Sequence, residues 1–127
     1  MMGHSASLLF ALATMAATAD RDVTSFSHRQ LAPGQTFEIQ TVDRIYRGQL
    51  LDRATGKCQL ISSADGEHFT APSTVYLLGA TGGEQERQML VVMHQVKVGM
   101  KVELAVGDLN AEHRQITSEV KAIKLGG

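Results

Sequence analysis

Alternation of residue type over one long stretch, Leu90 to Val106, constrains the fold of this chain more than any other feature. Within LVVMHQVKVGMKVELAV every even-numbered residue except His94 is apolar. Successive side chains of a β-strand point to opposite faces, so a period of two predicts strands with one buried face and one face in water. We therefore expect the even-numbered side chains to lie in the core and those of Lys97, Lys101 and Glu103 to be exposed.

A glycine divides this stretch. A single strand of that length is long by ordinary standards. Gly99 tolerates bends and bulges that other residues resist, so it predicts either a sharp bend or the break between two strands.

Shorter segments elsewhere repeat the strand pattern. Residues 36–41 and 45–51 alternate in type, and Gly48 predicts strong curvature or a close approach of backbones. The turn signals between such segments are Pro33-Gly34, Asp52–Lys57 and Asp65-Gly66. In Asp52–Lys57 (DRATGK), Gly56 is placed to take a positive φ. Little helix is expected after residue 35. We predict an all-β fold over residues 36–125, a small antiparallel β-barrel or sandwich of about six to seven strands around one core.

The N-terminal segment allows two interpretations. Leu8 to Ala17 is an apolar run followed by the small-x-small sequence Ala17-Thr18-Ala19, which is typical of a signal peptide, although no Lys or Arg precedes it. The alternative is an Ala-rich helix that packs on the domain. Cleavage of residues 1–19 predicts a secreted or periplasmic protein, whereas an intact chain predicts a cytoplasmic one.

Two further expectations concern this end of the chain. The apolar run is too short for a transmembrane helix, so we expect no membrane-spanning segment. Residues 20–35 are polar and mixed in type, and we expect them to form a linker or arm that leads into the first strand.

Composition argues against several kinds of partner and cofactor. The formal net charge is -1 and the Lys and Arg residues are scattered, so nucleic acid is not an expected partner. Aromatic residues make up 5% of the chain and Trp is absent, which argues against stacking on sugars or bases. The single cysteine, Cys58, cannot form an internal disulfide, and KCQLIS predicts that it is a buried or half-buried strand residue. We predict no cofactor.

Two places hold side chains of the types that bind metal ions or transfer protons. In SADGEHF, Asp65, Glu67 and His68 lie close together, but a calcium loop needs more oxygen-bearing residues at alternating positions. His94 interrupts an apolar face. It is either a ligand or proton-transfer group or, as we expect, a histidine near the end of the barrel that is hydrogen-bonded to backbone or partly exposed. No second ligand stands at metal-site spacing and no nucleophile elbow occurs, so we predict neither a metal site nor catalytic residues.

Two short stretches resemble motifs of known families. SADGEHF resembles the Asp-box turn of sialidase-type propellers, with the spacing one residue short, and implies a similar turn. The matching residues are Ser63, Asp65, Gly66 and Phe69. IYRGQLLDRATGKCQL is similar in outline to the first motif of Sm-like RNA-binding barrels, which Gly48, Leu50 and Asp52 fit. The asparagine of that family's turn and the glycine of its second motif have no counterpart here.

These observations favour a domain that acts in binding or assembly without catalysis. A second hypothesis is an RNA- or nucleotide-binding small barrel of Sm or OB type, which requires basic side chains to share one face. Those side chains are Arg44, Arg47, Arg53 and Lys57. A third is a hydrolytic enzyme in which the Asp65/Glu67/His68 loop acts together with His94.

The partner site that we expect is Val75–Leu78, with Tyr76 as its anchor. The segment carries no charge, so as an edge strand it would offer a template for a second copy or another protein. The alternative is that the same strand is central and buried on both faces. Loops are expected on either side of it, at Ser63–Pro72 and Gly79–Gln88.

Overall fold

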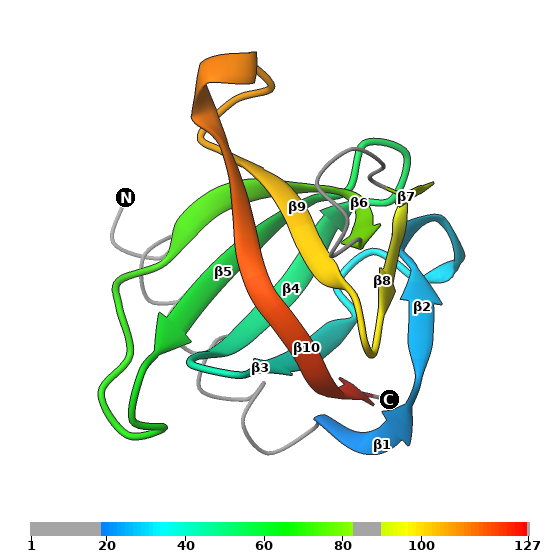
Figure 1. Cartoon of the computed structure of the whole chain (residues 1–127). Coiled ribbons are helices and arrows are strands. Elements are labelled where there is room, and N and C mark those ends of the chain that lie inside the picture. The colour runs from blue at the N-terminus through cyan, green and yellow to red at the C-terminus, as the bar shows by residue number, and fades with distance from the viewer. Residues whose placement is uncertain (1–18, 83–89, 127) are drawn as a thin grey trace.

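The computed structural model describes residues 19–82 and 90–126, which form ten β-strands and two short 3-10 helices (Figure 1). The strands are β1 (Ala19–Val23), β2 (Ser25–Ser27), β3 (Thr36–Thr41), β4 (Ile45–Asp52), β5 (Lys57–Ser63), β6 (Ser73–Gly82), β7 (Leu90–Met93), β8 (Gln95–Lys97), β9 (Lys101–Val106) and β10 (Arg114–Gly126). The helices are η1 (His28–Gln30) and η2 (Ala111–His113). The all-β prediction is confirmed, with more strands than expected.

Eight of the strands form one antiparallel sheet whose pairings return to their starting point. β3 pairs with β4, β4 with β5, β5 with β6, β6 with β9, β9 with β10, and β10 again with β3. Two strands lie outside this circuit: β1 pairs with the last part of β10, and β7 with the last part of β6. β2 and β8 form a separate two-stranded sheet.

Much of the core consists of apolar side chains that alternation predicts to point inward, and Phe26, Leu31 and Ala105 are buried in addition. Val96, Val102 and Leu104 are buried, and Lys101 is exposed, as expected. Two details were wrong. Val98 is exposed because it stands in the turn between β8 and β9, and Lys97 and Glu103 are half-buried rather than exposed.

The stretch from Leu90 to Val106 forms three strands, with breaks at His94 and Gly99. Gly99 has a φ of 92°, in the left-handed region that glycine adopts without strain, so the predicted break is confirmed. His94 has a φ of 66° and is the only non-glycine residue with positive φ among those described. The period of two continues through His94, which is why the sequence pattern does not reveal this second break.

Gly48 allows a close approach, as predicted. The ring of Phe37 on the neighbouring strand β3 occupies the space that a Cβ atom at Gly48 would need. Phe37 and Leu50 are completely buried, and Cys58 is buried as expected. The glycine therefore lets an aromatic ring fill the interior of the strand circuit.

Two predictions about connecting segments were wrong. Residues 20–35 are not a linker: they contain most of β1, together with β2 and η1, which pair with or pack on the rest of the domain. Gly79–Gly82 belongs to β6 rather than to a loop, and residues 83–88 lie outside the described residues. The signal peptide or helix predicted over residues 1–19 falls almost entirely outside them as well. Within the described ranges, no helix has the length and apolar character needed to cross a membrane.

Candidate functional site

The first candidate site is the outer edge of β7, the last strand in the order of the eight-stranded sheet. One edge of β7 pairs with β6, from Gly79 opposite Met93 to Gly82 opposite Leu90. Among the described residues, no strand pairs with its other edge. In Figure 1, β7 lies beside the end of β6 and continues into β8.

The register of this pair shows which backbone groups of β7 point outward. The amide of His94 donates to the carbonyl of Leu78 at 2.9 Å, one residue beyond the Gly79–Met93 pair on each strand. That bond makes Gly79–Met93 a non-hydrogen-bonded pair, and the two kinds of pair alternate along an antiparallel ladder. Val92 therefore bonds to β6, whereas the N–H and C=O groups of Val91 and Met93 point away from it.

The same two residues expose apolar side chains. Val91 is 43% exposed and Met93 59% exposed. The sequence of β7, LVVM, contains no charge and no proline, the residues that commonly protect sheet edges from unwanted pairing. β7 thus combines outward backbone groups with an apolar, uncharged surface.

The second candidate site is a pair of histidines where β7 ends. The rings of His28 and His94 lie 5.2 Å apart between centroids, with their planes nearly perpendicular at 88°. The amide of His28 donates to the carbonyl of His94 at 3.2 Å. His28 is 1% exposed, and His94 is half-buried. His94 therefore stands where β7 ends and is partly exposed, which is one of the two arrangements expected for it.

One hydrogen bond fixes the protonation of His28. Its Nδ1 lies 2.7 Å from the backbone oxygen of Arg53, which can only accept, so Nδ1 carries the proton of the neutral ring. Nε2 is then a buried lone pair, and no hydrogen-bond partner lies within reach of it. Burial lowers the pKa of His28 below its ordinary value of 6.5, and the neighbouring His94 and Arg29 lower it further, while the bond to Arg53 and the charge of Asp52 oppose them.

Gly56 makes room for the buried ring. It has a φ of 80°, and a Cβ atom there would lie 2.9 Å from the His28 ring and 2.6 Å from the backbone oxygen of Leu77. The amide of Leu77 also donates to the carbonyl of Gly56 at 3.0 Å. The predicted positive φ in the turn between β4 and β5 is therefore confirmed, and its reason is contact with β6 and η1.

The predicted loop cluster of Asp65, Glu67 and His68 lies at the far end of β5 from the histidine pair. With seven residues, β5 separates the two regions by roughly 20 Å. His68 Nδ1 lies 2.7 Å from Asp65 Oδ2, and the backbone amides of Glu67 and His68 donate to Asp65 Oδ1. The His68 contact, followed by those amide bonds, lowers the pKa of Asp65. The structure does not bring this loop to His94.

The turn within this loop has the compact form implied by the Asp-box resemblance. Ser63 Oγ accepts hydrogen bonds from the amides of Asp65 and Gly66 and donates to Asp65 Oδ1 at 2.8 Å. All of these partners of the Asp65 carboxylate belong to the loop itself. This pattern of hydrogen bonds stabilises the turn.

Tyr76 is not on an edge. β6 pairs with β5 on one side and with β9 on the other, so Tyr76 faces Lys57 across one ladder and Ala105 across the next. The expectation that Val75–Leu78 is an edge strand was wrong, because the strand is central. One face is buried, at Val75 and Leu77, and the other, at Tyr76 and Leu78, is half-buried. An apolar run fits both arrangements, so the sequence could not separate them.

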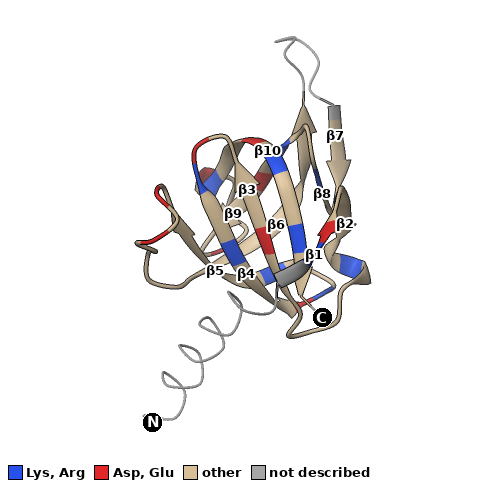
Figure 2. Cartoon of the chain, turned by 90° about the horizontal axis from the view of Figure 1, so that it is seen from below, with Lys and Arg blue, Asp and Glu red and all other residues tan. Residues whose placement is uncertain are grey.

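The basic side chains do not gather on one face. Arg44 and Arg53 stand beyond opposite ends of β4, and Arg47 forms an ion pair with Glu38 at 3.0 Å. Cross-strand neighbours form a row of alternating sign over β1, β10, β3 and β4. The row consists of Asp22, Lys124, Glu38 and Arg47. Figure 2 shows basic and acidic positions interspersed over these strands.

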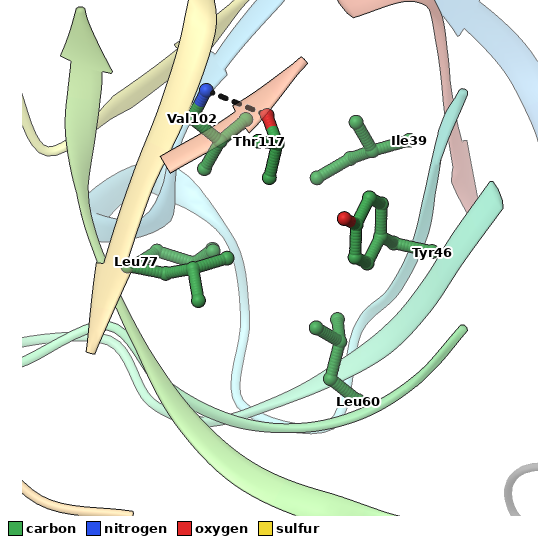
Figure 3. A pocket seen from close by; sticks show the side chains of 7 residues that line it. Ile39, Tyr46, Leu60, Leu77, Val102 and Thr117 are labelled. Carbon is green, nitrogen blue, oxygen red and sulfur yellow. Dashed lines mark hydrogen bonds between the residues drawn. The ribbon is translucent and has the colours of Figure 1, made fainter. Parts of the chain in front are cut away.

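A hollow lies inside the strand circuit, and each of its six strands lines it (Figure 3). The lining residues are Ile39, Tyr46, Leu60, Leu77, Val102, Leu104 and Thr117. The hydroxyl of Tyr46 points into it, and Thr117 Oγ1 accepts from the amide of Val102 at 3.0 Å. The hollow measures about 200 Å³ including space open to solvent, but no part is wide enough for a water molecule. It is a gap in packing rather than a ligand pocket.

Sequence reasoning missed both His28 and the β7 edge. His28 lies on the N-terminal side of the expected strands, in a segment expected to be a linker, and its approach to His94 depends on the pairing of β2 with β8. The residues of β7, LVVM, fit an edge strand and a central strand equally well, so their sequence gave no signal for the edge. Among the described residues, no three His, Cys, Asp or Glu side chains are grouped closely enough to hold a metal ion.

No known protein family, curated protein or solved structure matches this chain.

Proposed function

We propose that this chain is a non-catalytic β domain that acts in binding or assembly, through addition of a strand to the outer edge of β7. The proposal rests on one observation: among the described residues, this edge combines unpaired backbone groups with exposed apolar side chains. The backbone groups of Val91 and Met93 point outward, and the same residues expose apolar side chains on a strand without charge. An edge of this kind is a template for a further strand.

The strand that fits this edge is β7 of a second copy. In an antiparallel pair related by a two-fold axis at Val92, Val91 of one copy lies opposite Met93 of the other. Both residues present outward N–H and C=O groups, so each Val91–Met93 pair exchanges two backbone hydrogen bonds. The exposed apolar side chains of the two copies then meet as cross-strand neighbours, which removes them from water. The edge is therefore complementary to itself.

The short length of β7 sets the expected affinity. Four residues per copy bury far less than the roughly 1,600 Å² of a standard stable interface. We expect weak, concentration-dependent dimerisation, in the range from about 10 μM to about 1 mM.

The other two hypotheses draw less support. An RNA- or nucleotide-binding role requires the four basic side chains to share one face. They lie at both ends of β4 instead, and Arg47 within β4 is paired with Glu38. A hydrolytic role rests on cooperation of the Asp65 loop with His94, which lie at opposite ends of β5. Assembly needs neither arrangement.

Sedimentation velocity of the full chain over that concentration range tests the proposal. The parent should show a rising weight-average sedimentation coefficient, and Met93→Lys should remain monomeric because it places a charge in the pairing surface. Val42→Lys is the matched control: Val42 is 63% exposed in the turn between β3 and β4, so this variant should associate like the parent.

Proline substitutions test the register independently. Val91→Pro removes an outward N–H and should leave the monomer folded but unable to dimerise, whereas Val92→Pro removes a ladder bond to β6 and should destabilise the fold. A parent that stays monomeric at about 1 mM, or a Met93→Lys variant that associates like the parent, contradicts assembly through β7.

A further inference from the structure

His28 holds the β2–η1 segment, residues 25–30, against the turn between β4 and β5. Arg53 binds this segment twice: its carbonyl accepts from His28 Nδ1, and its guanidinium donates to the carbonyl of Arg29 at 2.8 Å. Phe26 anchors the other end, with its ring centroid 5.4 Å from that of Phe37. The backbone of the segment otherwise bonds to the three residues of β8 and, through the amide of His28, to the carbonyl of His94. It is thus a short segment whose attachment to the turn between β4 and β5 passes through His28 and Arg53.

The His28 ring can bind one further proton, at Nε2, but the charged ring is unfavourable in this site. Nδ1 already donates to Arg53, so a second proton must come from solvent and bind Nε2, which is buried, has no hydrogen-bond partner and lies against Gly56. A buried charge without a partner is much less stable than a neutral ring whose hydrogen bond is satisfied.

The charges around the ring make this cost larger. Arg29 follows His28 on η1, and His94 faces it from the junction between β7 and β8. From the turn between β4 and β5, the carboxylate of Asp52 acts on the ring in the opposite direction. From β6, the backbone oxygen of Leu77 adjoins the same position beside Gly56 as the ring does. Among the charged and titratable groups of the described residues that act on the ring, Arg29 and His94 thus oppose a further proton and Asp52 favours it.

We propose that His28 makes attachment of the β2–η1 segment acid-sensitive: when Nε2 takes up a proton from solvent, the segment separates from the turn between β4 and β5 while the eight-stranded sheet stays folded. Separation brings Nε2 into water, where the charged ring is hydrated. The mechanism does not depend on association through β7.

Hydrogen exchange measured by mass spectrometry between pH 7.5 and pH 5.0, corrected for the intrinsic pH dependence of exchange, tests the proposal. Protection of residues 25–30 and 95–97 in the parent should fall by about tenfold per pH unit below pH 6.5, the slope expected for uptake of one proton on opening. Peptides from β4 and β5 should keep their protection. His28→Asn retains a donor toward the Arg53 carbonyl but cannot be protonated, so it should abolish the pH dependence, whereas the exposed control His68→Asn should retain it.

Three results would overturn the proposal. They are protection of residues 25–30 that does not change with pH, an equal loss of protection in β4 and β5, and the same pH dependence in His28→Asn. If His28→Asn does not fold, the ¹⁵N shift of His28 Nε2 in the parent decides the question. Protonation must occur over the pH range in which the amide signals of residues 25–30 are lost, and a mismatch rejects the mechanism.

Discussion

The turn between β4 and β5 and the loop between β5 and β6, at opposite ends of β5, each combine a glycine at positive φ with a histidine bound through Nδ1. The φ values are 80° at Gly56 and 82° at Gly66, and both histidine contacts measure 2.7 Å. The surroundings differ. His28 is the first residue of η1 and is buried, whereas the side chain of His68 is 85% exposed and its partner Asp65 also lies in solvent.

This difference teaches that local geometry does not determine how much a contact matters. Near Gly66 the nearest atom to an added Cβ is the Cδ1 of Ile45 at an ordinary 3.5 Å, so the turn has space around it. Near Gly56 the nearest atom is a backbone oxygen that cannot move aside. At Gly66 glycine is favoured only by its positive φ. At Gly56 the absence of a side chain is also needed for the neighbouring residues to pack.

The largest expected effect comes from adding one methyl group at each glycine. Gly66→Ala should cost about 1–2 kcal/mol of unfolding free energy, the strain of a left-handed alanine. Gly56→Ala adds a clash with the Leu77 carbonyl and should cost at least about 3–5 kcal/mol or prevent folding. Urea denaturation of both variants measures the difference, and equal costs would show that the buried turn has unexpected room.

A smaller difference is expected from removing the two rings. His28→Ala leaves a cavity and an unpaired Arg53 carbonyl, and should lower the unfolding free energy by about 2–4 kcal/mol. His68→Ala removes an exposed contact that water replaces, and should produce no measurable change. Thermal unfolding followed by circular dichroism compares them. A destabilised His68→Ala variant would mean that the exposed loop contributes to the fold.

The smallest expected effect is a difference in the pH at which each end of β5 loses stability. Burial lowers the pKa of folded His28 below 6.5, so the unfolded chain binds more protons and stability falls as the pH drops below about 6.5. Hydrogen bonds lower the pKa of folded Asp65 below 3.8, so its contribution is present above about pH 4 and is lost only in stronger acid. Urea denaturation at pH 7.5, 5.5 and 3.5 should show both losses. His28→Asn should remove only the first, and Asp65→Asn only the second.

The sequence predicted features that depend on neighbours along the chain. Alternation placed Phe37, Val102 and Leu104 in the core, and the turn DRATGK required a glycine at positive φ. The edge strand and the histidine pair depend instead on which strands meet. Nothing local in an uncharged apolar run distinguishes β6, paired on both sides, from β7, paired on one. The contact of His28 with His94 likewise requires β2 to pair with β8, and neither three-residue strand has enough alternation to be recognised.

The closed circuit of pairings has a consequence for synthesis on the ribosome. Its last strand in chain order is β10, and Ile123 on that strand pairs with Ile39 near the start of the circuit. Until β10 has emerged, β3 and β9 each lack one of their two neighbours, so the growing chain carries unpaired edges that can join other nascent chains. Closing a loop of this length is also slow compared with forming hairpins. Docking of β10 should therefore limit the rate of folding, and chaperones that bind extended segments have their longest opportunity just before it.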